Sequence, residues 1–431
     1  MSKGFPVDSW EFGNELSGQG IGACVDAEVY AQDLIGLKAV LDELYQNSTS
    51  KPLLLAPGGF FDKQWYTQLL QTSGPGVVDG ITHHIYNLGG GRGSLPSPRR
   101  VRKDVEQFSA VTRRVRKDED WYSAITGECE KGHGILPSPG KVRKDVVLCH
   151  HQEGEKGRLF SVRPGNDPHL PNKILDPQYL SRVSDIYRDL QQIIQRHGPW
   201  VSAWVGEAGG AYNSGGHLVS NTFLNSFWYL DQLGMASKFN TKTYCRQSLV
   251  GGNYGLLDTE TFIPNPDYYS ALLWHRLMGK VVLSVDNNGS SFLRAYAHCA
   301  KEKAGVSLVL INLNNTEFRI TVQKVMKNKI NEDYETKNNG SLFDGLKKMT
   351  SWIGREAPSS SIKRKEYHLT AKDGNHRSRT MLLNGRTLEL SEDGQIPDLV
   401  PSYVYSNLPI IVAPLSIVFV VIPNFDAEAC S

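Results

Sequence analysis

The chain has 431 residues and a mass of 48.0 kDa, which is long enough for two or three domains. Its composition, 40% hydrophobic and 21% charged, is globular and excludes a disordered chain. Lys and Arg together number 47 against 45 Asp and Glu, so the net charge of +2 argues against a dedicated nucleic-acid or membrane-surface protein.

The first 278 residues alternate between short β-rich runs and longer amphipathic stretches. The predicted strands are Ser9–Gly13, Pro52–Pro57, Val77–Tyr86, Trp200–Gly206 and Thr241–Leu249. The predicted helices are Val25–Tyr45, Asp62–Gln71, Gln178–Arg196, Leu218–Leu233 and Tyr268–Met278. Five strand-then-helix units in a row indicate a parallel sheet.

One segment, Gly90–Arg163, fits neither strands nor helices. It holds a repeat, since Leu95–Val105 recurs as Leu136–Val146, and it carries 16 Lys/Arg against 10 Asp/Glu, a net of +6. A basic arm for a polyanion is one interpretation. We prefer a disordered insertion without a selected role, because the segment has neither a helical stripe nor interleaved aromatics.

After Lys280 the pattern changes to short apolar runs separated by Asn-Gly, Asn-Asn and Asp-Gly turns. The predicted strands are Phe292–His298, Ser307–Leu313, Phe318–Val322, Thr387–Leu390 and Ile417–Ile422. They predict an antiparallel sandwich of about 150 residues. The most apolar stretch, Leu408–Ile422, contains two prolines and falls short of the roughly 20 residues of a membrane span, so it is expected to form two strands.

Signals for the cell compartment conflict. The first residues lack the apolar core of a signal peptide. Six cysteines nevertheless leave room for a disulfide. Four glycosylation sequons are also present, at Asn47, Asn288, Asn314 and Asn339.

Two glutamates occupy strand ends. Glu15 follows the first predicted strand after a polar Asn14, and Glu207 closes the fourth, ahead of a glycine-rich run. In a barrel of parallel strands the carboxyl ends form the catalytic mouth. The two glutamates are therefore candidate catalytic residues, with helix capping as the alternative.

Four motifs in order resemble the heparanase and β-glucuronidase family of glycoside hydrolases, family 79, and the plant heparanase-like proteins most of all. They are Trp10–Leu16, resembling the acid/base motif, Thr82–Asn87 the sixth-strand motif, Trp204–Tyr212 the nucleophile motif, and Arg246–Tyr254 the eighth-strand motif. The resemblance covers Pro6–Gly89 and Pro164–Ser431.

The resemblance implies a retaining mechanism with Glu15 as acid/base and Glu207 as nucleophile. That chemistry requires the two carboxyls about 5–5.5 Å apart, with Glu15 protonated and Glu207 ionised at the working pH. It also implies that Asn14 contacts the sugar 2-hydroxyl and that Tyr86 hydrogen-bonds the nucleophile. His84 and Tyr86 are two apart on a strand and so share a face, which in the family points into the pocket, so both are candidate substrate-binding residues. His83 is then expected to point outward in a structural role.

Further residues follow from the same resemblance. Gln247, Gly252 and Tyr254 match the loop that contacts the uronic acid. Cys299 and Cys430 match a disulfide that pins the last strand, which requires an oxidising compartment. Cys24 and Cys245 are expected to be buried thiols, and no role is predicted for Cys129 or Cys149.

The expected fold is therefore α/β plus all-β: a partial (β/α)₈ TIM barrel, strands four to eight, followed by an antiparallel β-sandwich. The predicted units are residues 1–89 (strands four to six), 90–163 (the insert), 164–279 (strands seven and eight) and 280–431 (the sandwich). On this count the signal peptide and the first three βα units are absent, so we expect a truncated form of a longer secreted protein.

The sequence thus predicts a retaining hydrolase that cleaves β-glucuronosyl linkages in glycans or glucuronides, without metal or cofactor. The alternative is an inactive fragment that binds glycans or folds poorly. The expected partner is a glucuronic-acid-containing substrate and not nucleic acid, the expected state is a monomer, and no transmembrane segment is expected, although peripheral membrane association stays open. The expected location of the full-length protein is the cell wall and extracellular space, or the lysosome or vacuole.

Overall fold

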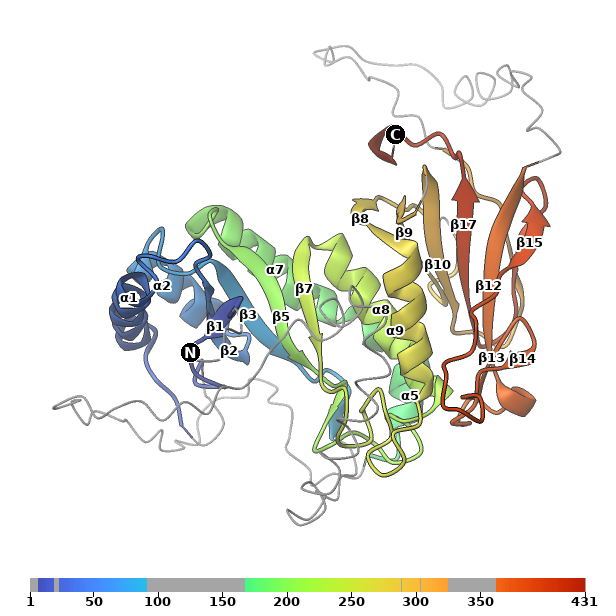
Figure 1. Ribbon diagram of the computed structural model, residues 1–431, viewed down its shortest axis with the longest axis horizontal. Coiled ribbons are helices and arrows are strands. Elements are labelled where there is room, and N and C mark those ends of the chain that lie inside the picture. The colour runs from blue at the N-terminus through green and yellow to red at the C-terminus, as the bar shows by residue number, and fades with distance from the viewer. Residues whose placement is uncertain are drawn as a thin grey trace, which may run out of the picture.

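The structure is a computed structural model that describes residues 7–18, 23–90, 167–287, 289–302, 304–324 and 362–430. It joins a parallel sheet with its helices to a set of antiparallel sheets (Figure 1). The predictions for the insert, for Cys129 and Cys149, and for the sequons at Asn288 and Asn339 lie outside the described residues, apart from Gly90, which ends a two-residue strand.

The parallel sheet has five strands in the order β1-β2-β3-β5-β7, and every neighbouring pair is parallel. Its strands are β1 (Ser9–Glu11), β2 (Leu53–Phe60), β3 (Gly80–Ile85), β5 (Ser202–Ala208) and β7 (Thr241–Arg246). All five correspond to predicted strands. A two-stranded parallel pair, β4 (Gly89–Gly90) with β6 (Ala211–Tyr212), lies beyond the ends of β3 and β5.

Helices cover one face of this sheet. They are α1 (Ala27–Leu44), α2 (Lys63–Ser73), α5 (Leu170–Leu175), α6 (Pro177–Ser181), α7 (Val183–His197), α8 (Phe223–Lys238) and α9 (Pro266–Leu277). Apolar side chains of α1, α2 and α7 pack with Leu54, Ile81 and Ala203 of the sheet in one core cluster. The predicted helix Gln178–Arg196 is divided between α6 and α7, and the one predicted from Leu218 begins only at Phe223, since Leu218 has φ +54°.

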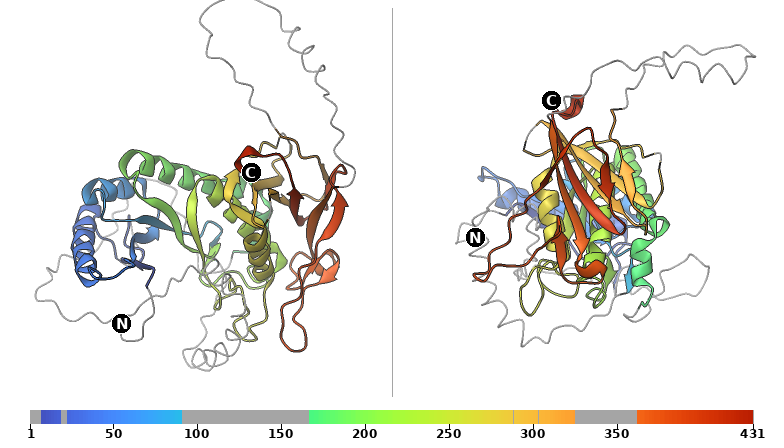
Figure 2. Two further views of the ribbon diagram at one scale, coloured as in Figure 1. Left: turned by 45° about the horizontal axis from the view of Figure 1, so that its top comes forward. Right: turned by 90° about the vertical axis from the view of Figure 1, so that its right-hand side faces the viewer.

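The antiparallel part is dominated by one large sheet (Figure 2). Its order is β14-β13-β12-β17-β10-β9-β8, and β15 pairs with β12. Its strands are β8 (Met278–Leu283), β9 (Leu293–Ala300), β10 (Gly305–Asn312), β12 (Lys363–Ala371), β13 (Met381–Leu383), β14 (Arg386–Thr387), β15 (Ser402–Tyr405) and β17 (Ser416–Pro423). A second pair, β11 (Phe318–Ile320) with β16 (Ile410–Val412), packs on one face.

The stretch Leu408–Ile422 forms β16 and β17, the two strands predicted for it. Among the described residues, no helix is long and apolar enough to cross a membrane.

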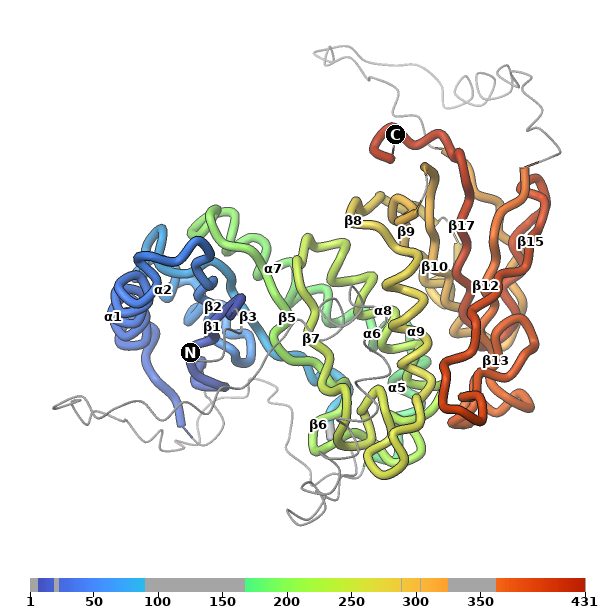
Figure 3. The backbone as a smooth tube through the Cα atoms, in the orientation of Figure 1, coloured from blue at the N-terminus to red at the C-terminus, as the bar shows by residue number. Residues whose placement is uncertain are grey.

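One hydrophobic core joins the two halves. Helix α9 ends at Leu277 and β8 begins at Met278, so the chain passes from the parallel to the antiparallel part without a loop (Figure 3). Helix α8 is buried along nearly its whole length, as a helix between two sheets must be. Its side chains and those of α9 share a cluster with Tyr296, Val309 and Phe419 of the antiparallel sheet.

The cysteines and sequons have varied surroundings. A disulfide joins Cys299 and Cys430, the pair that the resemblance implied. Cys245 is buried as expected, whereas Cys24 is half-buried and in a disulfide, so its prediction as a thiol is wrong. Asn47 is exposed after α1, and Asn314 is half-buried after β10.

Candidate active site

The predicted site residues meet at the carboxyl ends of the parallel strands. Glu15 lies just beyond β1, His84 is in β3 with Tyr86 just past its end, and Glu207 is near the end of β5. Gln247 directly follows β7. This is the edge at which parallel α/β sheets bind ligands. Asn14 is exposed beside Glu15.

Glu207 faces the site because β5 contains a bulge. Val205 pairs with His83, whereas the next β3 residue, His84, pairs with Glu207, so Gly206 is an extra residue. Strict alternation from the buried Val205 would turn Glu207 toward the helices. The bulge instead turns it to the face of His84, a frequent use of bulges beside active sites.

Glu15 is held in an unusual backbone conformation. Its φ is +57°, in the left-handed region that non-glycine residues seldom occupy. Its backbone N–H donates to the carbonyl of Gly58 at 2.6 Å, which ties the turn to β2. The Oε1 atom lies 2.9 Å from Nδ1 of His84, whose side chain is 2% exposed against 16% for Glu15. Strain of this kind gathers at functional sites.

Glu207 has a separate partner. The hydroxyl of Tyr86 donates to Oε1 of Glu207 at 2.5 Å. Burial raises the pKa of Tyr86 above its ordinary value, and the charge of Glu207 raises it further. Tyr86 therefore remains protonated and acts as a donor that orients the carboxylate. His84 and Tyr86 share a face, but each contacts a different glutamate.

The two carboxylates lie close together. One oxygen of Glu15, one ring nitrogen of His84 and one oxygen of Glu207 are all within 4.8 Å of one another. β1 and β5 are three strands apart in the sheet, which in a flat sheet means about 14 Å at the usual spacing between strands. The sheet must therefore curl around the site, and its concave face carries both carboxylates.

The loop after β7 provides a third wall. Tyr254 is buried, and Nε2 of Gln247 donates to its hydroxyl at 3.4 Å. Burial raises the pKa of Tyr254 above its ordinary value, opposed by the hydrogen bond from Gln247 and reinforced by the charge of Glu207. Gly252 has φ +68°, and a Cβ there would lie 3.0 Å from the carbonyl oxygen of Ser214. The loop can close over the site only with glycine at this position.

Gly209 was not singled out in the sequence, although it separates two rings of the site. A Cβ on Gly209 would lie 2.9 Å from Cε1 of Tyr86 and 2.9 Å from Cδ1 of Tyr254. Both tyrosines can flank Glu207 only because this position has no side chain. The glycine run after Glu207 was the available signal, but its neighbours come from distant parts of the chain.

The same three ligand atoms could in principle hold a cation. Two carboxylates and an imidazole suit several divalent metals. Here His84 contacts one oxygen of Glu15, and Tyr86 donates to one oxygen of Glu207, so each carboxylate is held in a fixed orientation. Two oriented carboxylates are the arrangement that acid/base and nucleophilic catalysis use.

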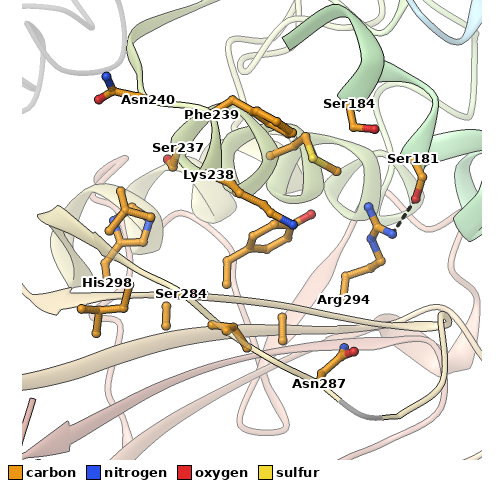
Figure 4. Close-up of a pocket in the computed structure, with 18 of the residues that line it drawn as sticks. Ser181, Ser184, Ser237, Lys238, Phe239, Asn240, Ser284, Asn287, Arg294 and His298 are labelled. Carbon is orange, nitrogen blue, oxygen red and sulfur yellow. Dashed lines mark hydrogen bonds between the residues drawn. The ribbon is translucent and has the colours of Figure 1, made fainter. Parts of the chain in front are cut away.

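A cavity of about 810 Å³ lies elsewhere, between the end of α8 and strands β8 and β9 (Figure 4). Among its lining residues are Ser181, Lys238, Asn287, Arg294 and His298, and none of the predicted site residues is among them. Arg294 donates to Ser181 at 2.8 Å across it. The cavity belongs to the junction of the two halves, away from the carboxylate pair.

Comparison with known proteins identifies the family of the chain. The family model described as "Glycosyl hydrolase family 79, N-terminal domain" matches residues 1–142 and 147–234. Heparanase-like protein 2 of Arabidopsis thaliana is 48% identical over 432 residues, which is all of this chain and 66% of that protein. Baicalin-beta-D-glucuronidase of Scutellaria baicalensis is 33% identical, over 98% of this chain and 60% of that protein. The chain thus spans about two thirds of the length of such relatives.

A solved structure supports the fold alone. A 4-O-alpha-L-rhamnosyl-beta-D-glucuronidase from Fusarium oxysporum superposes with a TM-score of 0.55 at 11% identity, covering 96% of this chain and 70% of that one. More than half of the chain matches the family model, and relatives up to 49% identical match its whole length. The chain therefore belongs to glycosyl hydrolase family 79.

Proposed function

We propose that this chain is a retaining glycosidase that cleaves β-glucuronosyl linkages. The observation that carries this proposal is the pair of carboxylate oxygens of Glu15 and Glu207 within 4.8 Å of each other. Retaining glycosidases hold their carboxyls about 5–5.5 Å apart, whereas inverting enzymes need about 6.5–9.5 Å to admit a water. The short separation therefore supports double displacement.

In the first step Glu207 attacks the anomeric carbon while Glu15 donates its proton to the leaving oxygen. A covalent glycosyl-enzyme forms and the aglycone departs. In the second step Glu15 takes a proton from water, whose oxygen attacks the same carbon and releases Glu207. Tyr86 orients the nucleophile through its hydroxyl, and His84 orients the acid. Asn14 hydrogen-bonds the sugar 2-hydroxyl.

The substrate is a glycan or glucuronide with a β-linked glucuronic acid. Gln247, Tyr254 and the backbone at Gly252 offer neutral donors for the sugar carboxylate. The baicalin-β-D-glucuronidase compared above is named as a glucuronidase, which supports this class.

The proposal for the fold is that the parallel sheet is part of a (β/α)₈ barrel. Strands β1, β2, β3, β5 and β7 correspond to strands four to eight of a (β/α)₈ barrel, whose mouth is the curled edge with Glu15 and Glu207. The disulfide Cys299–Cys430 and the exposed sequon at Asn47 support a secreted protein.

The test is hydrolysis of an aryl β-D-glucuronide by the full chain. Glu207→Gln should lower kcat by about 10⁴-fold or more, because the nucleophile is lost. Glu15→Ala should slow the reaction as well, with partial rescue by azide, a small anion that needs no general base. Glu43→Gln, at an exposed position of α1, is the matched control and should retain full turnover.

The anomer formed first decides the stereochemistry. NMR of early product should show β-glucuronic acid. Initial release of the α anomer, or full turnover by Glu207→Gln, would contradict the proposal, as would a folded wild-type chain with no turnover.

The proposed chemistry needs no cation, although Glu15, His84 and Glu207 could ligate one. Dialysis against EDTA should leave kcat/KM unchanged within error. Loss of activity that returns on adding a divalent metal would assign the cluster to metal binding instead.

A further inference from the structure

A buried cation lies directly behind the site. Arg246 ends β7, next to Gln247, and its side chain is 1% exposed. Its Nη2 donates to Oδ2 of Asp267 at 2.8 Å, and Asp267 is equally buried. Asn225 and Ser226 of α8 also donate to Asp267, at 2.7 and 2.8 Å. Because the Asp267 carboxylate accepts three hydrogen bonds, the Arg246–Asp267 pair is fixed in one geometry.

Arg246 uses this fixed position to hold the wall of the site. The same Nη2 atom donates to the backbone carbonyl of Tyr254 at 2.9 Å. Nothing in the described structure links the Arg246 guanidinium directly to the concave face, since its Nε and Nη1 atoms are buried and donate to no partner among the described residues. Arg246 therefore acts through Tyr254 and not on a sugar.

The guanidinium of Arg246 also packs against two aromatic rings. Its guanidinium carbon lies 5.0 Å from the ring of Trp228 and 4.6 Å from that of Tyr229. Such cation–π contacts hold both rings in place in a dry interior. The indole N–H of Trp228 in turn donates to Oδ1 of Asn87 at 2.9 Å. Asn87 is the residue after Tyr86, the donor to Glu207.

One buried arginine thus connects to both sides of the nucleophile. On one side Arg246 donates to the backbone carbonyl of Tyr254. On the other side it packs on the ring of Trp228, whose indole N–H donates to Asn87, the neighbour of Tyr86 in the chain. The two tyrosine rings are separated only by Gly209, so small movements of either would change the space around Glu207.

We propose that Arg246 is the positioning residue that sets Tyr254 and Tyr86 around Glu207, and that the selectivity of the site for a sugar carboxylate depends on it. This inference rests on the proposed function, because it concerns the same site. Two branches separate within it: the contact with Tyr254 governs carboxylate binding, and the contact through Trp228 governs the orientation of Glu207.

The test compares Arg246→Lys with a matched variant. Arg294 is also part of a largely buried pair, 2.7 Å from Asp231, but it lies at the junction of the two halves. Arg246→Lys should lower the ratio of affinities for D-glucuronate over D-glucose, measured by calorimetry, by about tenfold, the effect of one lost charged hydrogen bond. Arg294→Lys should lower the unfolding temperature similarly and leave that ratio unchanged.

A second variant tests the other branch and does not depend on the first one folding. Trp228→Phe keeps an aromatic ring at this position but removes the indole N–H that donates to Asn87. It should reduce kcat for an aryl glucuronide about fivefold to tenfold, with KM within twofold, because an orienting hydrogen bond to the Tyr86 segment is lost.

Outcomes for the two proposals are distinguishable. If wild type prefers glucuronate but does not turn it over, the hydrolase proposal fails, and the affinity ratio of Arg246→Lys still decides the role of Arg246. An unchanged ratio in Arg246→Lys overturns the positioning role, as does a wild-type chain without preference for glucuronate. A change in KM alone for Trp228→Phe overturns the second branch.

Discussion

The hydrogen bond from Tyr86 to Glu207 can be tested by removing one oxygen atom, the hydroxyl of Tyr86. A hydroxyl on a charged acceptor contributes about 1.5–3 kcal/mol. Tyr86→Phe should therefore lower kcat/KM by about ten- to a hundredfold, with little change in unfolding temperature because the ring remains. Kinetics on an aryl glucuronide check this, and activity within twofold of wild type would contradict it.

His83 lies on the opposite face of β3 and has a different role. It is fully buried, its ring lies 5.7 Å from that of Tyr187, and neither ring nitrogen has a hydrogen-bond partner among the described residues. Burial, together with the charge of the neighbouring His84, lowers the pKa of His83 to about 3. The structural role expected for it agrees with this packing.

That pKa makes stability depend on pH. The unfolded chain protonates His83 below about pH 6.5, while the folded chain resists until about 3, so stability falls as the pH drops between these values. Relative to wild type, His83→Leu should gain about 2 kcal/mol of unfolding free energy between pH 7 and pH 5. Urea titrations at both pH values measure it. His169→Leu, at an exposed position, is the control, and a parallel response of both variants would refute the assignment.

For single residues, the alternation of the sequence predicts which side chains share a face of a strand, but not where that alternation is interrupted. The period of two correctly placed His84 and Tyr86 on one face. It could not locate the bulge at Gly206, because a bulge depends on how two strands pair and not on either strand alone. The Arg246–Asp267 pair was likewise missed, since a buried ion pair looks in sequence like two surface residues.

Among the elements, helix α8 shows why a glycine can be preferred where propensity disfavours it. Gly234 sits inside the helix, and a Cβ there would overlap the ring of Tyr296 on β9. That ring is anchored by its hydroxyl, which donates to Asp231 at 2.6 Å. The helix and the antiparallel sheet can therefore approach only at a glycine.

Gly234→Ala should destabilise the protein by about 1–3 kcal/mol through overpacking, despite the better helix propensity of alanine. Gly36→Ala in α1 is the control, because nothing lies within 4 Å of its Cβ position. It should stabilise by about 0.5–1 kcal/mol. Thermal unfolding followed by circular dichroism measures both, and a stabilised Gly234→Ala would contradict the packing argument.

Strand β12 is one of the elements that pattern analysis missed. Lys363–Ala371 begins with four consecutive charged residues, which in sequence indicate a solvated segment. In the structure Arg364 and Glu366 are both buried, 2.6 Å apart, and Arg364 also donates to the carbonyls of Leu408 and Pro409. The strand lies inside the large antiparallel sheet because its buried charged side chains find partners there, and those partners lie about 40 residues away in the chain. The five parallel strands, by contrast, carry local apolar signals and were all predicted.

Across the whole molecule, the change from parallel to antiparallel structure is not a break in the core. The cluster around α8 and α9 includes side chains from six strands of the antiparallel sheet, and α9 continues directly into β8. We expect the two halves to unfold together, although chains of this length often unfold in stages.

Calorimetry should accordingly show one transition, coincident with the loss of tryptophan fluorescence and of helical circular dichroism. A fragment ending at residue 279 should not fold, because the apolar faces of α8 and α9 would be uncovered. Two resolved transitions, or a soluble folded fragment, would show that the halves are independent.

The curl that brings β1 and β5 together has a consequence for variation far from the chemistry. Strands β2 and β3 lie between β1 and β5, so the distance between Glu15 and Glu207 depends on the curvature of the sheet across all four strands. A replacement on β2 or β3 that changes the angle between neighbouring strands by a few degrees would move the two carboxylates apart. The proposed hydrolysis would then be lost while the protein stays folded. Loss of activity in natural variants can thus arise at positions that no sugar ever touches.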